Sequence, residues 1–277
     1  MGAEPVGARG RSGSAVGIVV LFPELLGTYG DGGNSVVAAQ RLRWRGIDAE
    51  IVTVSGGDPV PESADLYLLG GGEDGPQSLA ATTLATGGGL GRAVERGAAV
   101  LAVCAGFQIL GRTFIGPGGG QASGLGLIDC TTTRGAGPRR VGEIVVEAAT
   151  HLHLPVLSGY ENHSGVTALG PEATPLGAVT VGRGNDAGGG SLTEADEGAV
   201  TGHIVATYLH GPVLARNPAL ADMILSWIVG EELAPLDVAE VDELRRERLA
   251  AATSTTGRRR RFRLDGHRRQ GKARFVP

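Results

Sequence analysis

One cysteine stands where an apolar strand pattern passes directly into a helical pattern. Cys104 follows the run Ala99–Val103 and precedes the small residues Ala105 and Gly106. This order is typical of a nucleophile elbow, a strained turn between strand and helix that exposes one side chain and needs small neighbours. At the N-terminus of a helix, a thiol is favoured in its nucleophilic thiolate form. We therefore predict that Cys104 is a catalytic nucleophile and that the amide N–H of Ala105 stabilises an oxyanion; the alternative is a buried cysteine that ends a strand.

A thiol nucleophile needs a base, and His210 is the histidine whose position best fits this role. It follows an apolar run and precedes Gly211 and Pro212, so it should lie at the C-terminal edge of a sheet strand, where sites of open α/β folds form. His163, within the segment 159–165, fits a pocket lining and a loop equally well. The other four histidines fit solvated or packed positions: His151, His153, His203 and His267.

A glycine-rich segment follows another apolar run. Gly70, Gly71 and Gly72 come directly after Leu69 and precede Glu73. Because glycines let backbone N–H groups approach a ligand closely, Gly72 is a candidate for the second oxyanion donor. A phosphate-binding loop has a similar pattern, but a Walker motif is excluded because no Gly-Lys-Ser/Thr sequence follows.

The elements that must position these residues follow an α/β pattern in the first half of the chain. Apolar runs predict strands buried on both faces at Val16–Phe22, Ala49–Val54, Asp65–Leu69 and Ala98–Val103. Helices are expected between them at Asn34–Arg45 and at Gln77–Arg96, the second interrupted by glycines 87–89. This alternation predicts a doubly wound, mostly parallel sheet with helices on both faces.

The second half has weaker patterns. Strands are predicted at Leu125–Ile128, Glu143–Glu147, Ala178–Val181 and His203–Tyr208. Helices are predicted at Pro218–Val229 and Val238–Ala251. Glycine triplets at 118–120 and 188–190 predict loops.

The chain's length and composition indicate one domain with polar ends. Of 277 residues, 1–15 are expected to be a disordered N-terminus, 16–252 the domain and 253–277 a basic tail. The tail carries nine Arg and Lys residues against one Asp, a net charge of +8, which leaves −12 for the rest of a chain whose total is −4. A solvated, disordered extension is the simplest interpretation, and attraction to an anionic membrane surface is the functional one.

Metal, membrane and secretory classes are disfavoured. The two cysteines, Cys104 and Cys130, belong to no cluster with zinc-ligand spacing, so no metal is expected. The apolar runs are far shorter than the roughly 20 residues of a membrane helix, and no secretory signal is readable. The sequence therefore predicts a cytoplasmic protein. Nucleic-acid binding is not expected, because the basic tail lacks an accompanying folded motif.

Five motifs in order resemble the class I, or triad, glutamine amidotransferase domain. The resemblance runs over about residues 16–230. More narrowly, the chain resembles the branch of the class near cobyric acid synthase. The motifs that carry this resemblance are Tyr29–Asn34, Gly70–Asp74, Cys104–Gln108, Gly159–His163 and Tyr208–Pro212. Within that branch the motifs are similar to those of glutaminase subunits of lipid II isoglutaminyl synthases. The resemblance implies the flavodoxin-like fold of the class, with Cys104 as nucleophile and His210 as its base.

The resemblance also implies residues that contact glutamine. Gln108 and Gly71 are expected near the substrate, and Asn162 and His163 are candidates for the pocket wall. A substrate-binding arginine is implied just before the pair Gly142-Glu143, where spacing favours Arg139 over Arg140.

The chain departs from the wider class beside His210. In that class a Glu two residues after the histidine orients the imidazole, but here Pro212 occupies the place. Without an orienting acid, catalysis falls by orders of magnitude. We therefore hypothesise that a partner supplies the acid, so that the isolated subunit is a poor glutaminase; Asp and Glu residues of this chain are the alternative source.

The implied activity is hydrolysis of L-glutamine to glutamate and ammonia. The expected partner is a MurT-like Mur-ligase subunit in a heterodimer at the inner face of the cell membrane, which uses the ammonia to amidate the D-glutamate α-carboxyl of lipid II. No cofactor is expected in this chain; ATP and Mg²⁺ are expected on the partner. A corrinoid amidotransferase is one alternative, although its glutaminase is usually fused to a synthetase. A PfpI-like protein is another, although its histidine usually follows the elbow closely, whereas His210 lies 106 residues after Cys104.

Overall fold

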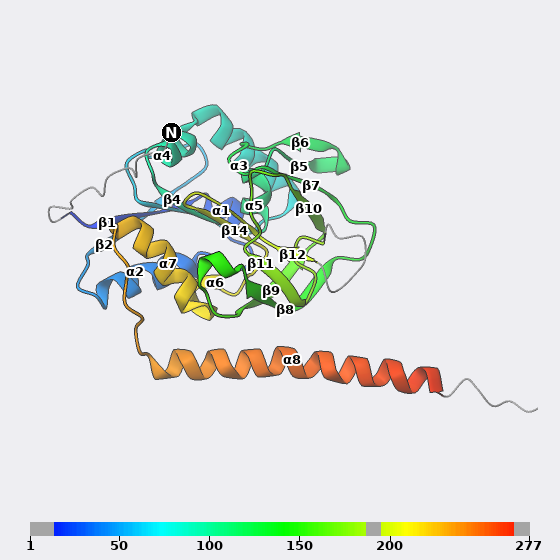
Figure 1. Cartoon of the computed structure of the whole chain (residues 1–277). Coiled ribbons are helices and arrows are strands. Elements are labelled where there is room, and N and C mark those ends of the chain that lie inside the picture. The colour runs from blue at the N-terminus through cyan, green and yellow to red at the C-terminus, as the bar shows by residue number, and fades with distance from the viewer. Residues whose placement is uncertain (1–13, 187–194, 269–277) are drawn as a thin grey trace, which may run out of the picture. The chain divides into compact units, whose positions relative to one another are not determined.

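The computed structural model describes residues 14–186 and 195–268, with side chains as far as Thr253 (Figure 1). Two compact units are distinguished, residues 1–237 and 238–277. The expectations for the N-terminus up to residue 13, for glycines 188–190 and for the last nine residues lie outside the described residues.

A six-stranded sheet forms the centre of the first unit. Its strand order is β13-β14-β4-β3-β1-β2. Five strands are parallel: β1 (Val16–Leu21), β2 (Ala49–Val54), β3 (Leu66–Leu69), β4 (Ala99–Val103) and β14 (Ile204–Thr207). Only β13 (Ala199–Thr201) runs antiparallel in this sheet. The predicted doubly wound, mostly parallel sheet is confirmed.

The strands differ in burial according to their place in the sheet. Strands β3, β4 and β14 lie inside it and are buried at every position, as their continuous apolar runs predict. Strand β2 lies at the edge, and Ile51 and Val52 are exposed. The expectation that β2 is buried on both faces is therefore wrong.

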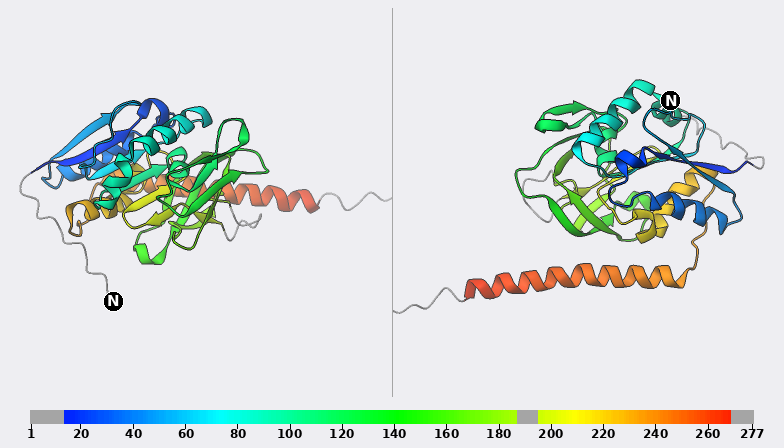
Figure 2. Two further views of the ribbon diagram at one scale, coloured as in Figure 1. Left: turned by 90° about the horizontal axis from the view of Figure 1, so that it is seen from above. Right: turned by 180° about the vertical axis from the view of Figure 1, so that it is seen from behind.

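Helices cover both faces of this sheet, as Figures 1 and 2 show. One group packs together below the sheet in Figure 1: α2 (Gly33–Arg43), α6 (Val213–Arg216) and α7 (Pro218–Val229). The other group lies on the opposite face: α1 (Pro23–Leu26), α3 (Asp74–Gly87), α4 (Gly89–Glu95) and α5 (Ala105–Leu110). The break between α3 and α4 at Gly88, which has φ 63°, confirms the interruption predicted there.

Two smaller four-stranded sheets lie beside the main sheet. One has the order β10-β7-β5-β6, with β5 (Thr113–Ile115), β6 (Gln121–Ser123), β7 (Cys130–Arg134) and β10 (Gly165–Leu169). The other has the order β12-β11-β8-β9, with β8 (Arg140–Ala148), β9 (Leu157–His163), β11 (Gly177–Val181) and β12 (Asp196–Glu197). Short 3₁₀ turns occur at Pro117–Gly119 and Thr150–Leu152.

One predicted strand is wrong. Leu125–Ile128 is irregular, and the strand of this region is β7, which begins at Cys130. Leu125 and Leu127 pack against the core from a loop whose Gly126 has φ 68°. An apolar sequence is thus buried here without forming a strand, while the Thr-rich β7 forms one.

The second unit contains α8 (Ala239–Arg268), which includes the helix expected at Val238–Ala251 and continues past residue 252. None of the helices in the described part of the chain is long and apolar enough to cross a membrane.

Candidate active site

Cys104 lies in the turn between β4 and α5 with a strained backbone. Its φ of 53° and ψ of −103° lie outside the conformations that side chains ordinarily adopt, which costs about 1–3 kcal/mol. The turn is crowded, because a Cβ added at Gly106 would lie 2.7 Å from the Cβ of Leu69. The structure therefore has the geometry of a nucleophile elbow, and glycine at position 106 permits it.

His210 lies just after β14 and is held by its backbone and its side chain. Its N–H donates to the carbonyl of Tyr160 at 2.9 Å, and its carbonyl accepts from the N–H of Tyr160 at 3.1 Å. Its Nδ1 lies 3.0 and 3.2 Å from the two carboxylate oxygens of Asp31. The imidazole is 3% exposed, and the ring of Tyr29 lies against it at 4.9 Å.

The charge state of His210 depends on Asp31 and Cys104. Burial disfavours the charged imidazole, but the hydrogen bonds to Asp31 and Cys104 and their negative charges outweigh burial and raise the pKa of His210 to about 10. Its Nε2 is buried and makes no hydrogen bond of regular geometry within the described residues. Cys104 is the second side chain, besides Asp31, that acts on the His210 ring, and a proton transfer between thiol and imidazole requires such proximity.

The carboxylate beside His210 comes from this chain. Asp31 is 3% exposed, and besides facing Nδ1 its Oδ2 accepts a hydrogen bond from the N–H of Gly71 at 2.9 Å. The hypothesis that a partner supplies this acid is therefore wrong. Pro212, which stands where the wider class has its carboxylate, instead packs on Gly33, where an added Cβ would lie 2.5 Å from its Cγ.

A signal for Asp31 was present in the sequence. It is the acidic residue of the first motif, Tyr29–Asn34, and three of its neighbours are glycines that offer no side chain. What the sequence did not reveal is that this loop and the segment after β14 meet, although Asp31 and His210 are separated by 179 positions in the sequence.

The two expected oxyanion donors lie beside the nucleophile. Gly72 and Ala105 line the same pocket as Cys104. Within the described residues, neither backbone N–H donates a hydrogen bond, so both are available to a developing oxyanion. Gly71 differs, since its N–H is bonded to Asp31. A Cβ at Gly71 would lie 2.8 Å from both His210 and Tyr29, so this glycine permits their close approach.

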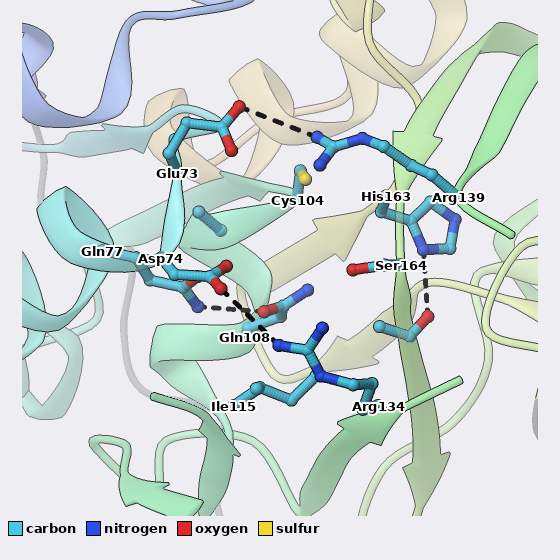
Figure 3. Close-up of a pocket in the computed structure, with 13 residues that line it drawn as sticks. Glu73, Asp74, Gln77, Cys104, Gln108, Ile115, Arg134, Arg139, His163 and Ser164 are labelled. Atoms are coloured by element: carbon cyan, nitrogen blue, oxygen red, sulfur yellow. Dashed lines mark hydrogen bonds and ion pairs between the residues drawn. The ribbon is translucent and has the colours of Figure 1, made fainter. Parts of the chain in front are cut away.

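The pocket is open to solvent and brings together three of the remaining predicted residues, Gln108, Arg139 and His163 (Figure 3). Gln108 is one of them; its Oε1 accepts from Gln77 at 2.9 Å and its Nε2 donates to the hydroxyl of Tyr208 at 3.2 Å. His163 also lines the pocket, stacked on Tyr208 at 3.8 Å, and its Nδ1 donates to the carbonyl of Gly165 at 3.0 Å. His163 is thus both a pocket wall and a packed residue.

The structure separates the two candidate arginines. Arg139 lines the pocket and donates from Nε to Asn162 Oδ1 at 2.5 Å and from Nη2 to the hydroxyl of Tyr29 at 2.6 Å. Asn162 also directs its carbonyl oxygen to the nucleophile, 4.0 Å from Cys104 Sγ. Arg140 instead pairs with Asp186, and its side chain is only 9% exposed. Of these two candidates, Arg139 is therefore the arginine that can reach a ligand in this pocket.

Among the residues that the structure describes, no group of three or more His, Cys, Asp or Glu side chains is arranged to hold a metal ion. The second cysteine, Cys130, is buried in the core, and burial raises the pKa of its thiol to about 12. A thiol of this kind is inert, in contrast to one that faces an imidazole.

Comparisons with known proteins assign this arrangement to a family. Residues 17–218 match the CobB/CobQ-like glutamine amidotransferase domain. The lipid II isoglutaminyl synthase (glutamine-hydrolyzing) subunit GatD of Staphylococcus aureus (strain N315) is 32% identical over 78% of this chain and 86% of that protein. GatD of Streptococcus pneumoniae is 32% identical over 74% of this chain and 76% of that protein. Cobyric acid synthase of Brucella abortus (strain S19) is 36% identical over 58% of this chain, but the match covers 32% of that protein.

Solved structures show the same fold. A crystal structure of a glutamine amidotransferase has a TM-score of 0.51 and 20% identity, covering 76% of this chain and 98% of that chain. The glutaminase domain of Trypanosoma brucei CTPS with bound acivicin also has a TM-score of 0.51, with 10% identity, covering 82% and 99%. At these identities the likeness concerns the fold alone. Sequence match and fold agree, and the chain belongs to the CobB/CobQ-like glutamine amidotransferase family.

Proposed function

We propose that this chain is the glutaminase subunit of a lipid II isoglutaminyl synthase. The observation that carries the glutaminase activity is the convergence of His210 and Asp31 on Cys104, which lines the pocket. The lipid II assignment is supported by the two GatD relatives, which match over most of their own length. The corrinoid alternative has less support, because the match covers about a third of cobyric acid synthase. Family membership sets the PfpI-like alternative aside.

The reaction begins with attack of the Cys104 thiolate on the side-chain carboxamide carbon of L-glutamine. The N–H groups of Gly72 and Ala105 hold the oxyanion of the tetrahedral intermediate. His210, protonated at neutral pH and held by Asp31, donates its Nε2 proton to the departing nitrogen, so that ammonia leaves and a thioester remains. The neutral imidazole then removes a proton from water, which hydrolyses the thioester to glutamate and restores the thiolate–imidazolium pair.

Two residues, Arg139 and Gln108, are assigned to substrate contacts, and Gly71 makes room for the base. The hydrogen bonds of Arg139 to Asn162 and Tyr29 use Nε and Nη2. Its Nη1 is therefore available to glutamine. Gln108 forms the pocket floor with Gln77. Gly71 acts by leaving room for His210 rather than by donating its N–H, which Asp31 occupies.

The ammonia acceptor lies on a partner. The GatD relatives are described as subunits, which supports assembly with a second chain. We assign that role to a MurT-like Mur-ligase subunit that binds ATP and Mg²⁺ and activates the D-glutamate α-carboxyl of lipid II. Ammonia free in water near neutral pH would mostly become ammonium, so transfer through a sheltered path is expected. Because lipid II is lipid-linked, the complex is expected at the inner face of the cell membrane.

Co-expression with a Mur-ligase-like partner tests this function. The purified complex should amidate lipid II with glutamine or with ammonium as the nitrogen source. Cys104→Ala should abolish glutamine-driven amidation and retain ammonium-driven amidation, because only the ammonia source is lost. Loss of both would show that Cys104 has a structural role. Amidation of a corrinoid in place of lipid II would favour the alternative function.

A further inference from the structure

The second unit of the chain carries a charge that the proposed mechanism does not use. Residues 238–277 contain twelve Arg and Lys against five Asp and Glu, a net charge of +7, which leaves −11 for the first unit. The excess is concentrated towards the end of α8, drawn orange to red in Figure 1. There the arginine segment, residues 258–268, holds six arginines and one aspartate, a net charge of +5. Because eleven residues occupy about 16 Å of a helix axis, this positive charge is dense.

The charges of the arginine segment are not balanced within the helix. An acid pairs with an arginine of the same helix when the two are three or four residues apart, and at these spacings Arg258, Arg259 and Arg260 have no Asp or Glu. The same spacings instead bring arginines together, for example Arg259 and Arg263. Like charges at such positions destabilise a helix. The segment is therefore stabilised by an anionic partner outside the helix.

The helix dipole does not account for these arginines. Cations are favoured in the last turn of a helix, and α8 ends at Arg268, so the run 258–261 lies well before that turn. The first half of α8 follows the usual rules. Glu240 and Asp242 lie in its first turn, and residues 239–253 hold four acids against three arginines. The unbalanced charge is thus confined to the second half of the helix.

We propose that the arginine segment binds the anionic phospholipid surface of a membrane and so holds the chain where its acceptor substrate lies. The choice of a membrane rests on the proposed function, since lipid II is lipid-linked. Clusters of basic residues are attracted to anionic lipid headgroups by charge alone. Such attraction needs no fitted groove or folded motif, which suits four consecutive arginines on a helix.

Binding of this kind is peripheral and reversible. Among the described helices, none is long and apolar enough to cross a membrane. The arginine segment has two large apolar residues, Phe262 and Leu264, and their spacing of two does not place them on one face of a helix. Electrostatic attraction therefore supplies the affinity. Each basic residue near an anionic surface strengthens binding about fivefold, and the attraction falls off within the Debye length, about 8 Å at physiological ionic strength.

Vesicle sedimentation with the full-length chain tests the proposal without requiring turnover. The probes are vesicles of phosphatidylcholine alone and vesicles in which about a third of the lipid is phosphatidylglycerol. At low ionic strength the chain should sediment with the anionic vesicles and not with the neutral ones. It should be released at about 1 M salt, where the Debye length is about 3 Å. Equal binding to both kinds of vesicle, or binding to neither, would overturn the proposal.

Paired variants locate the contact on the helix. Arg259→Gln combined with Arg260→Gln should weaken binding to the anionic vesicles on the order of 25-fold, about fivefold for each charge. The matched control, Arg246→Gln with Arg248→Gln, removes two charges from the first half of the same helix, about 20 Å away, and should change binding less than about threefold. An equal loss in both double variants would contradict the assignment to the arginine segment.

A conservative exchange distinguishes surface attraction from recognition of one phosphate. Arg259→Lys combined with Arg260→Lys keeps both charges and removes the guanidinium fork. This variant should bind the anionic vesicles as the wild type does, because attraction to a charged surface depends on charge. Loss of binding in the Lys variant would mean bidentate recognition of a particular phosphate ligand and would overturn the proposal.

Two further measurements separate the partner class and the proposed function. Tighter binding to double-stranded RNA than to anionic vesicles at the same salt concentration would overturn the membrane in favour of nucleic acid. Glutamine hydrolysis in solution should be equal in the Gln double variant and the wild type, because the residues that line the pocket lie outside the arginine segment. A wild-type chain that binds anionic vesicles without hydrolysing glutamine would refute the proposed function and leave the membrane contact established.

Discussion

Replacing Asp31 with Asn tests the central contact of the site with little change in side-chain size. In the native site, Oδ1 lies 3.2 Å from His210 Nδ1, and Oδ2 lies 3.0 Å from Nδ1 and 2.9 Å from the N–H of Gly71. An amide has one acceptor oxygen and an NH₂ group that only donates. Whichever way the amide turns, its NH₂ group faces a buried donor, either the Nδ1–H of His210 or the N–H of Gly71.

The magnitude follows from two losses. The hydrogen bond to the Asp31 carboxylate and its negative charge help to raise the pKa of His210 to about 10, and both weaken in the variant, so the imidazolium is less favoured beside Cys104. The ring also loses the acceptor that fixes its tautomer, and in the Ser-His-Asp triad the same substitution lowers kcat about 10⁴-fold. For Asp31→Asn we expect kcat for glutamine hydrolysis to fall about 10³- to 10⁴-fold, with KM little changed.

Two measurements check this expectation. Steady-state ammonia release gives kcat and KM, and the pH profile of Cys104 alkylation reports the change in thiolate–imidazolium pairing. Asp129→Asn is a matched control, because Asp129 pairs with Arg112 at 2.7 Å outside the pocket. A kcat close to that of the wild type for Asp31→Asn would refute the reasoning and would return the orienting acid to the partner.

The remaining predictions concern stability and its pH dependence. Burial raises the pKa of Glu197 from 4.5 to about 7, so its stabilising contribution is complete below pH 4.5 and is lost as pH rises through 7. Glu197→Gln should remove this loss. In urea unfolding, the free energy of unfolding of the variant relative to that of the wild type should therefore be about 3 kcal/mol higher at pH 8 than at pH 4. Gly106→Ala should lower stability by about 1–3 kcal/mol and abolish glutaminase activity, whereas Gly91→Ala, whose added Cβ meets nothing within 4 Å, should be neutral or stabilising in thermal denaturation. Arg140→Met should destabilise the fold by about 1–3 kcal/mol, because Asp186 would keep only its longer contact with Arg183, at 3.9 Å, while KM for glutamine stays unchanged.

The sequence predicted those parts whose cause is local. Runs such as Ala99–Val103 are apolar because the strand is buried on both faces, so composition alone indicates a parallel sheet. The elbow at Cys104 could be predicted for the same reason, because the crowded turn requires small residues next to Cys104 in the sequence. Helices α3 and α4 were also separable, because Gly88 ends one of them in a left-handed conformation.

The sequence failed where the cause is distant. Strand β9 has the sequence Leu-Ser-Gly-Tyr-Glu-Asn-His, without apolar alternation, and it exists because it pairs with β8 on one side. Asp31 can orient His210 only because the loop after β1 meets the segment after β14. At Leu125–Ile128 the error was the opposite one: a strand was predicted, but these apolar residues belong to a loop that packs against the core.

The edge of β9 that does not pair with β8 holds the backbone of the base, His210. Tyr160 bonds both backbone groups of His210, while its own side chain is 37% exposed, so the contact depends on the backbone and tolerates different side chains at this position. The neighbouring Gly159 is different, because an added Cβ would lie 2.7 Å from the Cβ of Leu209, the residue before the base. A side chain there would push β9 away from His210 and with it Asn162, whose carbonyl faces Cys104. The position of the base relative to the nucleophile therefore depends on β9, and β9 can pack this closely because position 159 has no side chain.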